Sequence, residues 1–361
     1  MAVVLTWWLI VTGFAIVTAN RLNVAGDDAY TWMDPAKIAP ASWNPLELII
    51  QWDATWFQGI VNDGYQYHGP DQLANIAFFP IFPLATRAVS WPLYDNTVLA
   101  GWAVSLIALI GAGYFLRKLV LEFHPKAVAD ETLLLLLTFP AATFFWAPYT
   151  ETTLLFFAIA SMYYARRGEF WKAGLLGFVA ALSRPPGMLI VIPLVIEYCL
   201  RYWNRPLFRR ELFALALPPL GLASYFAFLW ASFGDPMAYF KVQSAWGRGF
   251  VLNAEHFWTG SPAAAANLGM DITYLVIGVA LSILVLWRVR LSYGVYCLAA
   301  IFLPVMTGTL MSMNRYVGVL FPIYIAISQL FPKPVKQAWL FASILMLGLT
   351  LTLYVHGHWA G

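Results

Sequence analysis

The chain has 361 residues, of which 61% are hydrophobic and only 11% are charged. Soluble domains carry about 25% charged residues, so this composition excludes an ordinary soluble protein. Apolar runs long enough to cross a hydrocarbon layer of about 30 Å recur along the whole chain, and they are continuous rather than alternating. The pattern therefore favours a bundle of membrane-spanning helices over a β-barrel, the other structure that satisfies its backbone in lipid.

The first apolar run, residues 2–19, predicts a first span rather than a cleaved signal peptide, because no basic segment precedes it. Residues 20–95 follow as a predicted first extracytoplasmic loop, in which residues 45–57 are typical of a helix lying in the membrane interface. Residues 76–94 are apolar, but three prolines and an arginine interrupt them. We therefore expect that segment to be broken or re-entrant rather than a complete span.

Ten further apolar runs follow, and a second extracytoplasmic loop is expected over residues 233–271. Together they predict one all-α integral membrane domain over residues 1–361, with about eleven spans. The ten runs are 97–116, 131–147, 150–165, 171–183, 186–200, 212–232, 272–287, 292–312, 316–331 and 338–355.

The basic residues are distributed unequally between alternate connections. Of the 21 lysines and arginines, 14 lie in the connections near 117–130, 166–172, 201–211, 288–290 and 332–337. Cytoplasmic loops carry an excess of lysine and arginine, so these connections are expected to face the cytoplasm. The first and second extracytoplasmic loops then lie on the opposite side, provided that residues 76–94 do not cross fully.

The polar residues expected on that side form the candidate site. Asp53 lies between Trp52 and Trp56, and its alternatives are a solvated loop acid or a helix N-cap. Arg184 precedes two prolines, where a helix must break, and a cation there needs an anionic partner. Glu151 follows another break, where the alternative is an acid favoured by the helix dipole. The remaining candidates are Tyr65, Gln243, Trp246, Arg248 and Arg315.

These residue types fit a transfer of a sugar from a phosphate-linked lipid. A carboxylate can accept a proton from an attacking hydroxyl, and arginines hold phosphate through forked hydrogen bonds. Aromatic side chains provide flat apolar faces on which sugar rings pack. No metal site is predicted, because the five histidines show no ligand spacing.

Several motifs, in this order, resemble the PIG-V family of GPI mannosyltransferase 2 type, which has the GT-C glycosyltransferase fold. The resemblance extends over about residues 50–325. The motifs are Trp52-Asp53-Ala54 with Phe57, Gly64-Tyr65, Ala77-Phe78-Phe79-Pro80, Pro148-Tyr149-Thr150-Glu151, Ser183-Arg184 with Gly187, Gly234-Asp235-Pro236 with Gln243 and Trp246-Gly247-Arg248, and Asn314-Arg315-Tyr316.

The resemblance implies an inverting transfer, most simply of mannose, from a polyprenyl-phosphate donor of the dolichol type to a hydroxyl of a glycolipid or extracytoplasmic glycan. It implies Asp53 as the catalytic base. Charge and sidedness suggest Arg184, Arg315 and Arg248 as donor-phosphate ligands. Trp52, Trp56, Tyr65, Glu151, Gln243 and Trp246 are the expected substrate-binding residues.

The chain is shorter than the eukaryotic members, which favours a prokaryotic relative in the plasma membrane; a eukaryotic protein would lie in the endoplasmic reticulum. The site is expected on the extracytoplasmic face, among membrane lipids. No cofactor is required and no nucleic acid is an expected partner, although a divalent metal bridging Asp53 or Glu151 to the phosphate stays open. The alternative functions are a non-catalytic subunit of a glycosyltransferase complex and a lipid or sugar transporter, whose broken helices carry charges at the membrane midplane.

Overall fold

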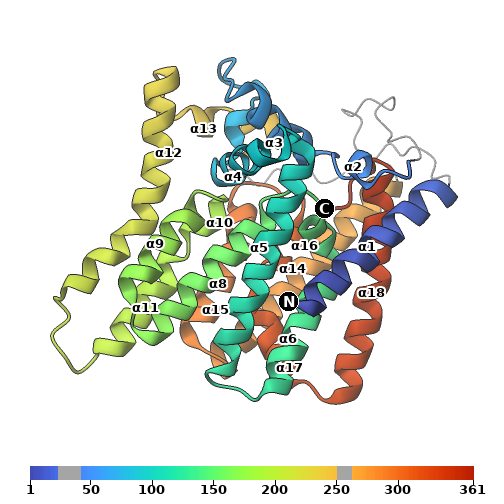
Figure 1. Cartoon of the computed structure of the whole chain (residues 1–361). Helices are drawn as coiled ribbons and strands as arrows, with labels where there is room; N and C mark the ends of the chain where they lie inside the picture. Colours follow the sequence, from blue (N-terminus) through green and yellow to red (C-terminus); the bar gives the residue numbers. More distant parts are fainter. Residues whose placement is uncertain (23–41, 250–261) are drawn as a thin grey trace.

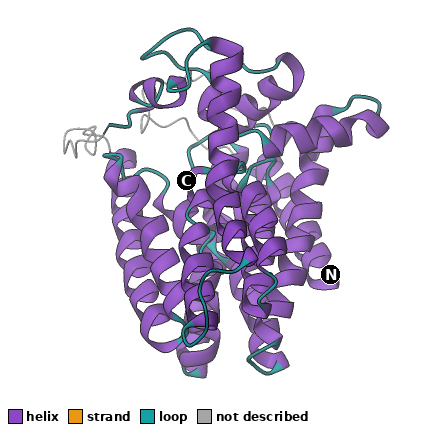
Figure 2. Cartoon of the chain, turned by 90° about the vertical axis from the view of Figure 1, so that its left-hand side faces the viewer, coloured by secondary structure: helices purple, strands orange, loops and turns teal. Residues whose placement is uncertain are grey.

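The computed structural model describes residues 1–22, 42–249 and 262–361. Within these ranges the regular structure is helical and no β-strand is present (Figures 1 and 2). The longer helices run side by side as a bundle, and several short helices lie across one end of it (Figure 1). This is the all-α membrane architecture that the sequence predicts.

Among the described residues, six helical segments are long and apolar enough to cross a membrane. They contain between 18 and 25 residues, and at a rise of 1.5 Å per residue about 20 residues match the hydrocarbon thickness. The protein is therefore an integral membrane protein. The six segments comprise α1 (Ala2–Arg21), α5 (Thr97–Leu121), α10 with α11 (Pro185–Met188, Val191–Tyr202), η5 with α12 (Arg210–Ala216, Leu217–Phe233), the part Ala264–Arg288 of α14 (Pro262–Arg288), and α18 (Lys333–Val355).

The remaining apolar runs form shorter helices, so the long helices are fewer than the spans expected from sequence. α6 (Lys126–Thr138) is followed by η4 and α7 (Pro140–Ala142, Thr143–Trp146) at an angle of 74°. The break falls at Pro140, because proline disfavours helical backbone in the residue before it. The others are α8 (Glu151–Arg167), α9 (Phe170–Ala181), α15 (Leu291–Met306), α16 (Met313–Gly318) and α17 (Phe321–Leu330).

Glycines allow α9 to be approached closely by α10 and α12. A Cβ atom on Gly187 of α10 would lie 1.8 Å from the Ala180 carbonyl oxygen of α9. A Cβ atom on Gly221 of α12 would lie 2.5 Å from the Phe178 carbonyl oxygen of the same helix. Small residues let helix backbones come together in membranes, and here they fix the position of the break that carries Arg184.

The first loop, predicted over residues 20–95, contributes short helices at one end of the bundle, which we call the site end. They are α2 (Pro45–Leu48), α3 (Asp53–Asp63), η2 (Asn75–Ala77), α4 (Ile81–Ser90) and η3 (Trp91–Leu93). α4 has 10 residues, about 15 Å of helix, which is too short to cross the membrane. The connections after α5, α11 and α17, three of the basic connections, lie at the opposite end (Figure 1).

The second loop reaches the site end as well. It contains α13 (Ala238–Lys241) and η6 (Ser244–Trp246). The Asp71 N–H donates to the Lys241 carbonyl oxygen at 3.0 Å, which joins the two loops. The following helix, α14, begins at Pro262 rather than at 272, because the run of alanines before Met270 favours helix although it is not strongly apolar.

Candidate active site

Asp53 is the first residue of α3, and a tight turn precedes it. The Ala54 N–H donates to the Gln51 carbonyl oxygen at 3.1 Å, and Trp52 has φ 55° and ψ −121°. These angles belong to the second residue of a type II′ turn, a position that glycine normally occupies. The Tyr149 hydroxyl donates to the Gln51 carbonyl oxygen at 2.9 Å and accepts from the Asp53 N–H at 3.1 Å. The turn and Tyr149 together fix the backbone position of Asp53, from which its side chain extends.

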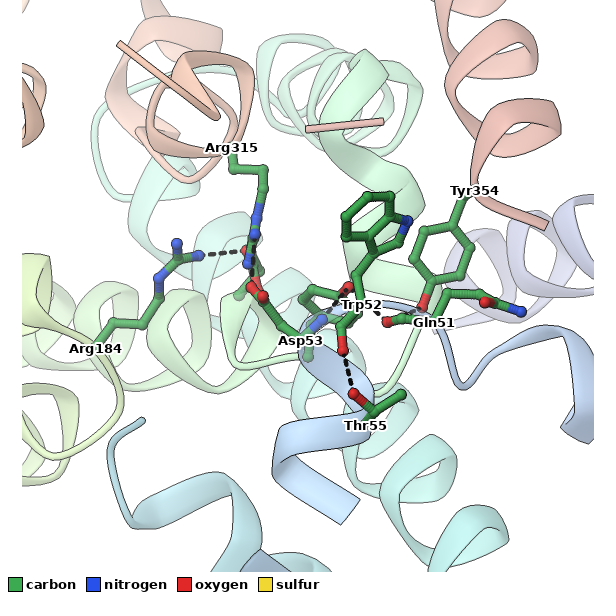
Figure 3. Close-up of polar contacts among 9 residues, drawn as sticks. Gln51, Trp52, Asp53, Thr55, Arg184, Arg315 and Tyr354 are labelled. Atoms are coloured by element: carbon green, nitrogen blue, oxygen red, sulfur yellow. Dashed lines mark hydrogen bonds and ion pairs between the residues drawn. The ribbon is translucent and has the colours of Figure 1, made fainter. Parts of the chain in front are cut away.

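Four charged side chains from separate elements form a continuous chain of ion pairs (Figure 3). Arg315 donates through Nη1 to Asp53 Oδ2 at 2.8 Å and through Nε to Glu151 Oε1 at 2.7 Å. Arg184 donates through Nη1 to the same Glu151 oxygen. Because Asp53 is in α3, Glu151 in α8 and Arg315 in α16, the chain of ion pairs connects three segments that are distant in sequence.

Burial distinguishes the two carboxylates of this chain. The Glu151 side chain is 0% exposed, whereas the Asp53 side chain is 21% exposed. Burial of an ion is costly unless it is paired, and Glu151 is paired with two arginines. Asp53 is therefore the carboxylate of this chain of ion pairs that is open to solvent, and Glu151 is the buried anion that binds both Arg184 and Arg315.

Arg315 is held in place by its helix and by aromatic rings. The Met313 N–H at the start of α16 donates to Asp271 Oδ1 at 2.9 Å. The Arg315 guanidinium carbon lies 4.6 Å from the Phe144 ring centre and 5.0 Å from the Tyr149 ring centre, within cation–π distance. Sequence reasoning missed Asp271, which it placed at the end of the second loop, whereas in the structure this residue lies within α14.

Arg184 lies at the break between α9 and α10. Its backbone is extended, with φ −162° and ψ 159°, as expected for a residue that precedes a proline. The extended backbone lets the side chain reach Glu151 while its guanidinium carbon lies 5.5 Å from the Tyr316 ring centre. The sequence correctly indicated that this cation needs an anion, and in the structure the anion is Glu151.

Arg248 follows the left-handed Gly247 at the end of η6. Its Nη1 lies 3.5 Å from Gln243 Oε1, and no carboxylate forms an ion pair with it among the described residues. Arg248 Nε is buried, and no acceptor among the described residues forms a hydrogen bond with it. Tyr316 and Asp53 raise the pKa of the Arg248 guanidinium, and burial acts against them.

Positive charge exceeds negative charge within the group formed by Asp53, Glu151, Arg184, Arg248 and Arg315. Three arginines face two carboxylates, and the two ion-paired arginines share both carboxylates between them. The unshared positive charge is that of Arg248, which forms no ion pair with a carboxylate of the described residues. An anion with one negative charge would balance this group of side chains.

Three aromatic side chains from both loops form a cluster beside this charge. The Trp56 and Trp246 rings lie 5.2 Å apart and the Phe78 and Trp246 rings 5.4 Å apart, both edge to face. Trp56 and Phe78 are stacked at 6.1 Å. Tyr65 is not in the cluster, because its hydroxyl donates to the Phe78 carbonyl oxygen at 2.9 Å and its ring lies 5.4 Å from Phe228.

Trp52 is placed differently from Trp56. Its residue is only 8% exposed, and its indole N–H donates to the His358 carbonyl oxygen at 3.1 Å. Tyr354 of α18 also reaches this region and lies beside Gln51 (Figure 3). Its hydroxyl donates to the Ile49 carbonyl oxygen at 2.7 Å. Trp52 and His358 are 306 positions apart, so no local sequence signal indicates such contacts.

Comparison with known proteins places the chain in a family. The sequence profile described as mannosyltransferase (PIG-V) matches residues 9–221, more than half of the chain, and that range includes Asp53, Glu151 and Arg184. GPI alpha-1,6-mannosyltransferase 2 of Rattus norvegicus is 32% identical over 159 residues, covering 41% of this chain and 31% of the rat protein. GPI mannosyltransferase 2 of Yarrowia lipolytica is 32% identical over 104 residues, covering 28% of this chain and 29% of that protein.

The fold resembles that of a solved GT-C glycosyltransferase. The crystal structure of ArnT from Cupriavidus metallidurans, bound to undecaprenyl phosphate, superposes with a TM-score of 0.52 at 13% identity, covering 97% of this chain and 63% of ArnT. This likeness shows a GT-C fold, and the family profile shows the relationship by descent. The chain belongs to the mannosyltransferase (PIG-V) family.

Proposed function

We propose that the protein is an inverting glycosyltransferase, which transfers mannose from a polyprenyl-phosphate donor to a hydroxyl of a glycolipid or extracytoplasmic glycan. The observation that carries the proposal is the pairing of Asp53 with Arg315 at the site end. It puts a partly exposed carboxylate next to a group of arginines with a net positive charge. A base and a phosphate site are thereby adjacent, as transfer from a sugar phosphate requires.

In this proposal Asp53 is the general base. The acceptor oxygen attacks the anomeric carbon while its proton passes to the Asp53 carboxylate. The bond between the anomeric carbon and the phosphate oxygen breaks, and the electron pair leaves with the polyprenyl phosphate. Attack from the face opposite the phosphate inverts the configuration at the anomeric carbon.

The donor phosphate is proposed to lie against Arg248, with Arg184 and Arg315 completing the site. A phosphodiester carries one negative charge, which matches the unshared charge of Arg248. Arg184 and Arg315 each use only part of their five N–H donors on carboxylates, so each keeps donors for phosphate oxygens. Charge developing on the leaving phosphate is then met by arginines, and the scheme requires no metal or cofactor.

The substrate class is supported by the relatives. The rat and Yarrowia proteins are GPI mannosyltransferases, and ArnT was solved with undecaprenyl phosphate, a polyprenyl phosphate. A lipid-linked donor also explains why the site lies at the end of a membrane bundle. Trp56 and Trp246 are proposed to pack against a sugar ring, and Gln243 to orient Arg248.

The test is transfer of radiolabelled mannose from polyprenyl-phosphate mannose to host-membrane lipids and proteins, using purified wild type and Asp53→Asn in parallel. Asp63→Asn is the matched control, because Asp63 is an exposed carboxylate at the other end of the same helix. We expect wild type and Asp63→Asn to move label and Asp53→Asn to move none. Near-normal transfer by Asp53→Asn would show that Asp53 is not the base.

The same experiment separates the alternative functions. If the protein is a non-catalytic subunit or a transporter, the purified wild type moves no label, whether the donor carries mannose, glucose or arabinose. Transfer with glucose or arabinose but not mannose keeps the enzyme class and changes the sugar.

A further inference from the structure

We infer that Trp52 is a positioning residue for Asp53, and that residues 356–361, here called the tail segment, hold Trp52 in a strained backbone conformation. The inference rests on the proposed function in so far as Asp53 is the reacting carboxylate. It assigns Trp52 a role different from the substrate contact expected from sequence. The argument depends on the backbone at residue 52, on its side-chain contacts and on the anchoring of the tail segment.

The backbone of Trp52 is in a conformation that L-residues rarely adopt. Its φ of 55° with ψ of −121° places Cβ against the neighbouring peptide groups, which is why glycine usually takes this turn position. Such strain persists only where surrounding contacts enforce it, and it concentrates at functional sites. The strained residue here directly precedes Asp53.

Contacts on the indole provide that enforcement. The Trp52 N–H donates to the His358 carbonyl oxygen at 3.1 Å, and its ring packs edge to face on Trp359 at 4.8 Å. Both partners belong to the tail segment. These contacts fix the indole and so restrain the backbone of residue 52, and the turn at this residue sets the direction of the Asp53 side chain.

The tail segment is itself anchored to the bundle. The two ring nitrogens of His356 lie 2.7 Å from the Thr352 carbonyl oxygen and 3.1 Å from the Leu22 carbonyl oxygen. The Asn314 side chain donates to the Ala360 carbonyl oxygen at 3.0 Å. A segment with buried residues and fixed ends can act as a rigid support for Trp52.

The tail segment also contacts Arg315, the ion-pair partner of Asp53. The Trp359 ring centre is 5.7 Å from the Arg315 guanidinium carbon, and Asn314 is the residue before Arg315. One short segment therefore touches both the turn that carries the carboxylate and the helix that carries its cation. This geometry points to a support that holds the Asp53 and Arg315 side chains in contact with each other.

The experiment compares the 361-residue chain with three single variants and with the double variant that combines Trp52→Phe and Trp359→Leu. Trp52→Phe removes the indole N–H and keeps an aromatic ring, and Trp359→Leu removes the ring on which Trp52 packs. Trp43→Phe is the control, because Trp43 belongs to the same loop and is 75% exposed. Each protein is assayed for kcat and KM with polyprenyl-phosphate mannose. Each is also treated with a water-soluble carbodiimide, and modification of Asp53 is measured by mass spectrometry.

We expect Trp52→Phe and Trp359→Leu to lower kcat by about tenfold or more, since small displacements of a reacting group are costly, and to leave KM for the donor unchanged. The double variant should be no slower than the worse single variant, because both changes release the same support. Asp53 should be modified faster in Trp52→Phe, in Trp359→Leu and in the double variant than in wild type or Trp43→Phe.

Two results would overturn the inference. A raised KM with unchanged kcat would make Trp52 a substrate contact, and unchanged kcat together with unchanged modification of Asp53 would leave the tail segment no positioning role. The carbodiimide reaction does not depend on activity. If wild type transfers no mannose while Asp53 is modified faster in the variants, the positioning role stands and the proposed function fails.

Discussion

Asp53 and Arg315 are 262 positions apart in the chain, and their side chains meet at 2.8 Å. The same guanidinium holds Glu151, so one arginine organises a partly exposed carboxylate and a fully buried one. The pair therefore connects a short helix of the first loop, α3, to a helix late in the chain, α16. It also means that a phosphate bound by Arg315 would share this arginine with two carboxylates.

The two carboxylates should differ in their contribution to stability. Glu151→Gln leaves Arg184 and Arg315 without their common buried anion, and loss of one partner of a buried pair costs about 3–5 kcal/mol. Asp53→Asn should cost less, because Asp53 is partly exposed and Arg315 keeps its second carboxylate, Glu151. Thermal unfolding of both variants in one detergent checks the order, and a lower midpoint for Asp53→Asn than for Glu151→Gln would contradict it.

Arg248 should govern donor binding. Arg248→Ala removes the unshared positive charge, and a hydrogen bond to a charged group contributes about 1.5–3 kcal/mol. We therefore expect KM for polyprenyl-phosphate mannose to rise by about tenfold to a hundredfold. Lys241→Ala is the control, because that lysine pairs with Asp235 on the same loop. Equal KM values for the two variants would remove Arg248 from the phosphate site.

Backbone strain at Trp52 can be measured by comparing two substitutions that both remove the indole. At ordinary positions glycine is less stable than alanine by about 0.5–1 kcal/mol. At this turn the order should reverse, with Trp52→Gly more stable than Trp52→Ala by about 1 kcal/mol, because glycine adopts φ 55° without strain. The measurement is the thermal midpoint of each variant, and a lower midpoint for Trp52→Gly would count against a strained turn.

Close packing at Gly187 should be required for both stability and activity. Gly187→Ala forces α10 away from the Ala180 carbonyl oxygen, and overpacking of this kind costs about 1–3 kcal/mol. The shift also displaces Arg184, so transfer should fall along with the unfolding midpoint. Gly13→Ala in α1 meets no atom within 4 Å and should lower neither. The result that would contradict this account is a Gly187→Ala protein with wild-type stability and activity.

Much of the architecture was accessible from sequence. The long apolar runs predict α1, α5, α12 and α18, because a helix that faces lipid must be apolar over its whole length. The unequal distribution of basic residues correctly separated the ends of the bundle, and Pro80 and Pro83 indicated that the piece around α4 does not cross. Among the described residues, fewer segments than the eleven expected spans are long enough to cross a membrane, because a run such as 131–147 bends at Pro140.

The composition of the site was less accessible. Sequence pattern alone determined that acids and arginines gather at one end of a membrane bundle, since charged residues are excluded from lipid. Only the tertiary structure decided their partners: Glu151 faces two arginines rather than solvent, and Trp52 packs on the tail segment rather than beside Trp56. Burial at a membrane surface restricts which residue types are tolerated, whereas pairing depends on the packing of helices hundreds of positions apart, and no local pattern encodes that.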